Sequence, residues 1–81
     1  MPTVLRFGAY RVVIYTNDHR PAHVHVIGPN GRAVFDLHCP EGPPMVRDSR
    51  LNPDELAKIK AVLQRHLAEL CKAWEKIHGY P

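Results

Sequence analysis

Three of the six histidines of this 81-residue chain fall within one short segment, His19 to His25. His23 and His25 alternate with valines, and alternate residues of a β-strand point to the same face, roughly 7 Å apart. Burial explains valine in a strand, whereas strands do not favour imidazole on packing grounds. The alternating imidazoles are therefore the first candidates for a functional site.

The imidazole side chain accepts or releases a proton near neutral pH, which suits it to acid–base catalysis. Cleavage of RNA without a metal ion needs a base for the 2′-hydroxyl, an acid for the leaving oxygen and a cation for the phosphorane. His23, His25 and His19 could serve as the acid and the base. Three arginines are candidates for binding the phosphate: Arg20, Arg32 and Arg47. This first hypothesis is an endoribonuclease that needs no cofactor.

Three other interpretations of the same residues remain open. In one, the imidazoles are solvated strand residues that hydrogen-bond to Asp36. In another, His23, His25 and Asp36 bind a metal ion, because two histidines and a carboxylate can ligate zinc or iron. In the last, the segment binds a ligand without catalysis. Whether the protein is an enzyme stays open at this point.

The segments around the histidines predict an α+β fold in a single domain, residues 1–81. Residues 3–38 are rich in β-branched and aromatic side chains, which predicts an antiparallel sheet of about four strands. The strands are expected at 3–7, 10–15, 23–27 and 32–37. Asn30-Gly31 predicts a hairpin between the last two strands.

The alternation within this hairpin predicts which side chains share a face. Five apolar side chains are expected on the buried face: Val24, Val26, Ala33, Phe35 and Leu37. The opposite face is expected to carry His23, His25, Val34 and Asp36. A shift of the strand register by one residue would place Phe35 on the same face as the histidines, and the apolar side chains would no longer share one buried face.

The rest of the chain predicts a connection over residues 39–52 and one long helix over residues 53–78. Prolines at 40, 43 and 44 argue against regular structure in the connection. Asn52 is a suitable helix cap, and apolar residues recur at spacings of three and four after it. A helix of this length would be roughly 39 Å long, more than the sheet can cover. We therefore expect its far end to bind another chain through Leu70, Trp74 and Ile77.

The composition limits the compartment and the partners. The formal charge is +3, from 11 Lys and Arg against 8 Asp and Glu, which permits an anionic partner such as RNA without requiring one. Cys39 and Cys71 form no Cys-x-x-Cys pair, and we expect both to be free thiols in a reducing cytoplasm. Neither a signal-peptide pattern nor an apolar run of ~20 residues is found. The expectation is a cytoplasmic protein without membrane contact.

Several blocks of the sequence resemble the bacterial domain-of-unknown-function family 4160. They are Met1 to Arg6, Tyr10 to Asp18, Arg20 to Val26, Gly31 to Phe35 and Ala73 to Glu75. Ala22 stands where the family motif usually has a second proline before the first histidine. Members are typically encoded beside a second small protein, and such pairs are regarded as toxin–antitoxin modules. The resemblance implies a toxin-like protein with a cognate antitoxin-like partner, and we also consider RNA and a second copy of the chain as partners.

Overall fold

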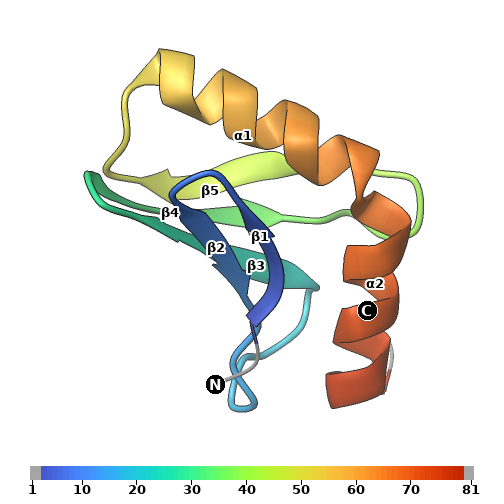
Figure 1. Cartoon of the computed structure of the whole chain (residues 1–81). Coiled ribbons are helices and arrows are strands. Elements are labelled where there is room, and N and C mark those ends of the chain that lie inside the picture. The colour runs from blue at the N-terminus through green and yellow to red at the C-terminus, as the bar shows by residue number, and fades with distance from the viewer. Residues whose placement is uncertain (1–2, 80–81) are drawn as a thin grey trace.

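The computed structural model describes residues 3–79 of the chain. Its five strands form one antiparallel sheet in chain order: β1 (Thr3–Phe7), β2 (Tyr10–Val13), β3 (His23–Gly28), β4 (Gly31–Asp36) and β5 (Met45–Ser49). Two helices follow, α1 (Pro53–Arg65) and α2 (Leu67–His78). Figure 1 shows α1 lying across one face of the sheet and α2 beside the end of the sheet. The α+β class is as predicted, but the sheet has five strands instead of about four and the helical region has two helices instead of one.

The β3–β4 hairpin determines which side chains face the helices. Gly28 pairs with Gly31 across a two-residue turn, so the hairpin lies where the Asn-Gly signal placed it. The five side chains predicted for the buried face are each at most 2% exposed: Val24, Val26, Ala33, Phe35 and Leu37. His23 pairs with Asp36 and His25 with Val34. Because side chains alternate along a strand, these four residues belong to the opposite side of the sheet.

The fifth strand corrects the prediction for residues 39–52. Met45–Ser49 is not irregular but pairs antiparallel with β4, with a register irregularity between Val34 and Phe35. The prolines at 40, 43 and 44 all precede this strand and so remove none of its backbone donors. Without β5, the outer edge of β4 would leave its own backbone groups unpaired.

Helix α1 begins where the sequence predicted it. The Oδ1 atom of Asn52 accepts the Glu55 backbone N–H at 2.8 Å, and the Asn52 Nδ2 donates to Glu55 Oε1 at 3.1 Å. The first of these bonds satisfies one backbone donor that a helix start otherwise leaves free, and the second joins the two side chains. Tyr10 also donates a hydrogen bond to the Glu55 carboxylate, which ties β2 to the first turn of α1.

The break between the helices places the residues predicted to bind a partner against the sheet. The helix stops at Arg65, and His66 separates it from α2 with φ −106° and ψ 16°. A straight rod would run past the sheet, whereas after the break Leu70 and Trp74 are buried in this chain's own core and Ile77 is partly buried against it. Leu70 and Trp74 therefore present little surface to another chain, and the binding of a partner at Ile77 stays a prediction.

Among residues 3–79, neither helix is both long and apolar enough to cross a membrane. α1 has 13 residues and α2 has 12, whereas a spanning helix needs about 20.

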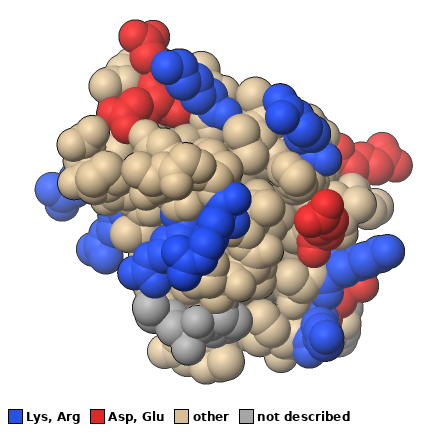
Figure 2. Space-filling view, viewed as in Figure 1, with Lys and Arg blue, Asp and Glu red and all other residues tan. Residues whose placement is uncertain are grey.

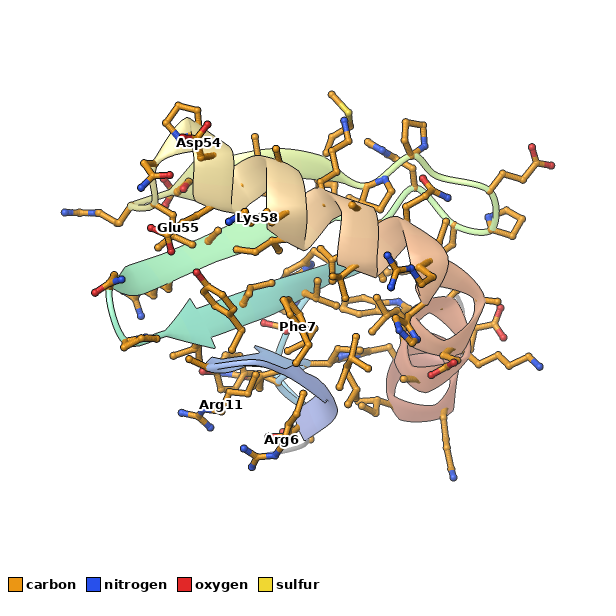
Figure 3. The ribbon with its side chains drawn as sticks, turned by 45° about the horizontal axis from the view of Figure 1, so that its top comes forward. Arg6, Phe7, Arg11, Asp54, Glu55 and Lys58 are labelled. Atoms are coloured by element: carbon orange, nitrogen blue, oxygen red, sulfur yellow. A yellow bond between two sulfur atoms is a disulfide. The ribbon has the colours of Figure 1, made fainter. Side chains whose placement is uncertain are left out.

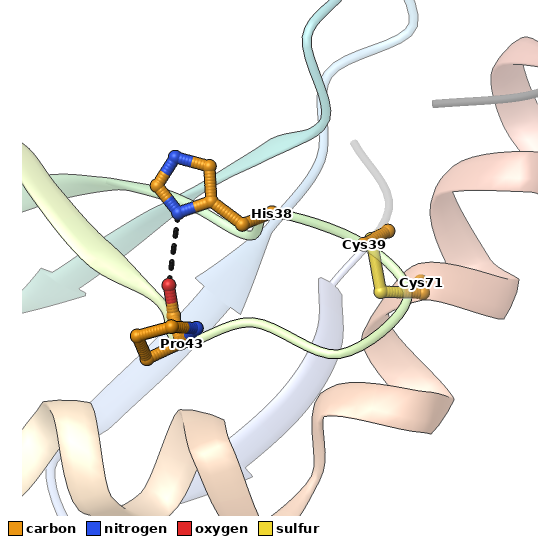
Figure 4. Close-up of a disulfide and its surroundings, with 4 residues drawn as sticks. All are labelled: His38, Cys39, Pro43 and Cys71. Atoms are coloured by element: carbon orange, nitrogen blue, oxygen red, sulfur yellow. Dashed lines mark hydrogen bonds between the residues drawn. A yellow bond between two sulfur atoms is a disulfide. The ribbon is translucent and has the colours of Figure 1, made fainter.

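Cys39 and Cys71 form a disulfide with their Cα atoms 5.9 Å apart (Figure 4). The prediction of two free thiols is therefore wrong. The bond joins the segment after β4 to α2. In the same segment the His38 Nδ1 donates to the Pro43 carbonyl at 2.9 Å, so His38 is held away from the histidines of β3. Together these contacts fix the path of the chain between β4 and β5.

Reduction of the disulfide should destabilise the protein by about 3–4 kcal/mol. A cross-link between residues 32 apart in the sequence removes that much conformational entropy from the unfolded chain in the chain-entropy model. Urea unfolding with and without a reductant measures the difference. The Cys39→Ser/Cys71→Ser double variant is the control and should not respond to the reductant. Equal unfolding midpoints for oxidised and reduced wild type would show that the bond does not stabilise the fold.

Candidate functional site

The helices cover one side of the sheet, and we call the opposite side the bare face. In Figure 3, Arg6 and Arg11 point away from α1, whereas Phe7 points toward it. Strand pairing places the following residues on the bare face: Arg6, Arg11, Ile27, Arg32, His25, Val34, His23 and Asp36. Both the candidate histidines and a set of arginines therefore lie on the side of the sheet opposite α1, although α2 at the end of the sheet reaches His23, whose ring packs against Trp74.

Asp18, His23 and His25 converge at one end of the bare face, and we call these three residues the histidine–carboxylate centre. The Nε2 atoms of His25 and His23 lie 3.2 Å and 3.5 Å from the same oxygen, Asp18 Oδ1. One ligand atom from each residue can be chosen so that all three lie within 4.8 Å of one another. The sequence predicted the two imidazoles, but not the carboxylate that they share.

A tight turn after β2 positions the carboxylate. The Asp18 backbone N–H donates to the Tyr15 carbonyl at 3.1 Å, and the Tyr15 N–H donates back to Asp18 Oδ2 at 2.9 Å. His78 at the end of α2 donates from Nε2 to the same Tyr15 carbonyl at 3.1 Å. Both Asp18 oxygens are therefore engaged, and the turn is fastened to the second helix.

The two imidazoles differ in exposure. The side chain of His23 is 6% exposed and that of His25 is 23% exposed. The His23 ring lies between the Trp74 ring, at a centroid distance of 5.2 Å, and the His25 ring, at 5.3 Å. His25 also meets the edge of Tyr15 at 4.7 Å. His25 is therefore the imidazole that a ligand on the bare face would reach.

The negative charge of the histidine–carboxylate centre lies on the Asp18 carboxylate. Partial burial raises the pKa of the Asp18 carboxyl, but the Tyr15 N–H and the adjacent His25 and His23 rings outweigh this effect. The net result is a pKa below the ordinary value for aspartate. Asp18 is thus ionised at neutral pH, and it presents a negative charge to both rings.

The remaining predicted site residues divide into two groups. An open hollow of about 560 Å³ adjoins the centre and is lined by Asn17, Asp18, His19, Arg20, Pro21, His23, Asp36 and Arg47. His19, Arg20 and Arg47 are thus near the histidines, as the ribonuclease hypothesis requires. Asp36, the expected metal ligand, instead forms an ion pair with Arg47 of β5. Arg32 lies away from this hollow, further along the bare face.

Four basic side chains follow one another across the strands, and we call Arg6, Arg11, Arg32 and Arg50 the arginine row. Arg6 pairs with Arg11, and Ile27 separates Arg11 from Arg32 in the strand register. The Arg50 backbone N–H donates to the Arg32 carbonyl at 2.9 Å, which extends the row beyond β5. Figure 2 shows adjacent basic side chains over the β1–β2 hairpin. Within the described part of the chain, no carboxylate lies within ion-pair distance of these four guanidinium groups.

Three hollows lie along the bare face between the arginine row and the histidine–carboxylate centre. One hollow contains Arg6 and Arg11, a second contains Arg32 and Arg50, and both include Ile27. A third, of about 390 Å³, is lined by Tyr15, His25, Ile27, Arg32, Val34 and Asp48. Because Ile27 lines all three, the hollows are neighbours on the bare face.

Comparison with known proteins places the chain in a family. A family model described as a domain of unknown function (DUF4160) matches residues 9–75, most of the chain, and the chain belongs to this family. No curated protein and no solved structure matches it. The match covers the turn with Asp18, both imidazoles and most of the second helix.

Replacing Asp18 by Asn should lower the free energy of unfolding at neutral pH by about 1–2 kcal/mol, because the amide carries no charge to stabilise the adjacent rings. The lowered pKa gives this effect a pH dependence. The stabilisation is present above the unfolded-state pKa of the carboxyl and is lost as the pH falls through the folded-state value. Urea unfolding from neutral to acid pH, with a chelator present, measures the difference.

Asp48→Asn is the matched control, because it removes an exposed carboxylate from the edge of the same sheet. It should change stability by less than about 0.5 kcal/mol at every pH. Equal effects of Asp18→Asn and Asp48→Asn would mean that the contacts of Asp18 with the two rings do not stabilise the fold.

Proposed function

We propose that this family member acts on single-stranded RNA at the bare face, as the toxin component of a toxin–antitoxin pair. One observation carries the proposal: the arginine row and the histidine–carboxylate centre share one sheet face, with neighbouring hollows along it that have Ile27 in common. The family resemblance contributes the toxin role and the cognate partner. The structure of the face contributes the choice of RNA.

Charge favours a polynucleotide over a neutral ligand. The net charge of +3 is modest, but the arginine row concentrates four cations across the sheet without compensating carboxylates among the described residues. Strands lie about 4.8 Å apart, so a row that crosses from β1 to the far side of β5 extends roughly 19 Å. Arginines spaced in this way can contact successive phosphates of one strand.

The shape of the face favours a single strand over a duplex. A flat sheet cannot enter the major groove of a double helix in the way that a helix or a two-stranded ribbon does. Single-stranded RNA, by contrast, offers unstacked bases that rest on aromatic side chains. Tyr15 and His25 form a T-shaped pair that lines one of the hollows and offers two aromatic rings there.

The chemical step is assigned to the centre as a whole. Cleavage by the 2′-hydroxyl removes a proton from that group, forms a bond from its oxygen to phosphorus, and releases the 5′-oxygen, which takes up a proton. Arg20 and Arg47 border the centre and could stabilise the charge on the phosphorane. We do not divide His23 and His25 into acid and base, because both rings face one carboxylate oxygen and His23 is buried.

The Arg11→Gln/Arg32→Gln variant should bind a single-stranded RNA oligonucleotide at least roughly tenfold more weakly than wild type. Each phosphate contact on a single strand contributes about 0.7 to the slope of log affinity against log salt, so the slope should fall by about 1.4. Fluorescence anisotropy across a salt series measures both quantities, with the disulfide oxidised and again with it reduced.

The matched control is Lys58→Gln/Arg65→Gln, which removes the same charge from α1 on the helical side of the molecule. It should retain nearly all of the affinity. An equal loss in both double variants would reduce the effect to net charge and contradict the proposed face. Tighter binding of duplex DNA than of single-stranded RNA would contradict the choice of ligand.

Expression in a bacterial host tests the toxin role. Wild type should arrest growth and degrade RNA, whereas the Asp18→Asn/His25→Gln variant should do neither. His66→Gln, which changes a histidine between the helices, is the control and should behave as wild type does. Unchanged toxicity of the Asp18/His25 variant would remove the centre from the mechanism.

A further inference from the structure

The hydrogen bond of His23 to the backbone determines which ring nitrogen carries its proton. The His23 Nδ1 lies 2.9 Å from the Pro21 carbonyl oxygen. A carbonyl oxygen can only accept, so Nδ1 must be the donor and must carry a hydrogen. In the neutral ring the other nitrogen, Nε2, is then a bare lone pair. That lone pair faces Asp18 Oδ1 at 3.5 Å.

His23 Nε2 and Asp18 Oδ1 face each other, and an imidazole nitrogen and a carboxylate oxygen are both atoms that ligate transition metals. The His23 ring is buried, so its direction toward the carboxylate is fixed by the surrounding protein. A cation placed between these two atoms would be bound by both.

The same three residues provide the distances that such a cation requires. For bonds of about 2.0–2.1 Å at tetrahedral angles, neighbouring ligand atoms lie roughly 3.3 Å apart. Oδ1 of Asp18 lies 3.2 Å from His25 Nε2 and 3.5 Å from His23 Nε2. One ligand atom from each residue can be chosen so that all three lie within 4.8 Å of one another. The two distances to Asp18 thus match the tetrahedral spacing closely, and the third pair of ligand atoms lies within reach of the same ion.

Neighbouring groups fix the orientation of the three ligand side chains, as the hydrogen-bond partners around a metal site usually do. Metal-binding histidines usually donate their other N–H to a carbonyl or carboxylate, which fixes the tautomer and the ring orientation. Pro21 has this role for His23. The Tyr15 N–H fixes the free oxygen of Asp18, and Trp74 packs against the His23 ring.

We propose that Asp18, His23 and His25 bind a divalent transition-metal ion of the zinc class. Imidazole nitrogen and carboxylate oxygen suit Zn²⁺ and its first-row neighbours, whereas Mg²⁺ and Ca²⁺ prefer oxygen ligands alone. Three protein ligands leave a position for water or for a phosphate oxygen, on the side where His25 is exposed. The site goes beyond the proposed action on RNA, since metal binding can be measured with no nucleic acid present.

The test is calorimetric titration of tag-free, chelator-stripped protein with Zn²⁺, and separately with Mg²⁺. The expected result is one Zn²⁺ bound per chain and no comparable binding of Mg²⁺. Asp18→Asn and His25→Gln should each weaken Zn²⁺ binding roughly 100-fold or more, since even supporting residues of metal sites cost 10–100-fold when replaced. His66→Gln, a histidine between the two helices and outside the centre, is the matched control and should keep wild-type affinity.

A second measurement keeps the test independent of folding defects in the variants. In ¹⁵N-labelled wild type, Zn²⁺ should shift the Nε2 resonances of His23 and His25 while Nδ1 of His23 stays protonated. Binding that survives in both variants, binding lost equally in His66→Gln, or Zn²⁺-induced shifts confined to other histidines would overturn the proposal. Loss of RNA binding with intact Zn²⁺ binding would leave this site standing and contradict only the proposed function.

Discussion

Burial of one side of the sheet is the constraint on which the rest of this structure depends. A chain of 81 residues can bury only a small hydrophobic core. The strands and both helices therefore bury their apolar side chains in one shared interface. The period of two along a strand then sends every second residue to the other side. His25 and Arg32 are on the bare face for this reason, while their neighbours Val26 and Ala33 are in the core. The burial of apolar side chains on one face therefore determines that the polar residues lie on the other face. Interactions among the polar residues are not needed to place them there.

Local patterns were sufficient for the parts of the fold that local interactions decide. The Asn30-Gly31 signal and the alternation after it predicted the β3–β4 hairpin and its faces, and Asn52 with Glu55 predicted the start of α1. Three features depend on distant packing and could not be predicted in this way. The break at His66 is favourable because it lets α2 bury apolar side chains against the end of the sheet. Strand β5 forms because the edge of β4 has free backbone groups to pair with. The disulfide forms because α2 turns back and brings Cys71 close to Cys39.

The same distinction applies to the candidate site. Alternation along one strand was enough to predict that His23 and His25 share a face. The choice of carboxylate required tertiary information, because Asp36 lies opposite His23 but is neutralised by Arg47 from the unpredicted β5. Asp18 reaches the imidazoles through a turn that returns onto the sheet, and its only local signal was an aspartate three residues after Tyr15.

The central claim is that the uncovered side of the sheet is the working surface of the protein. Mapping of backbone amide shifts during titration with a single-stranded RNA oligonucleotide tests this claim most directly. The account predicts that the largest shifts fall on Arg11, His25, Ile27 and Arg32, while the amides of α1 stay near their free positions. Shifts concentrated on α1, or no saturable shifts on β2, β3 and β4, would contradict it.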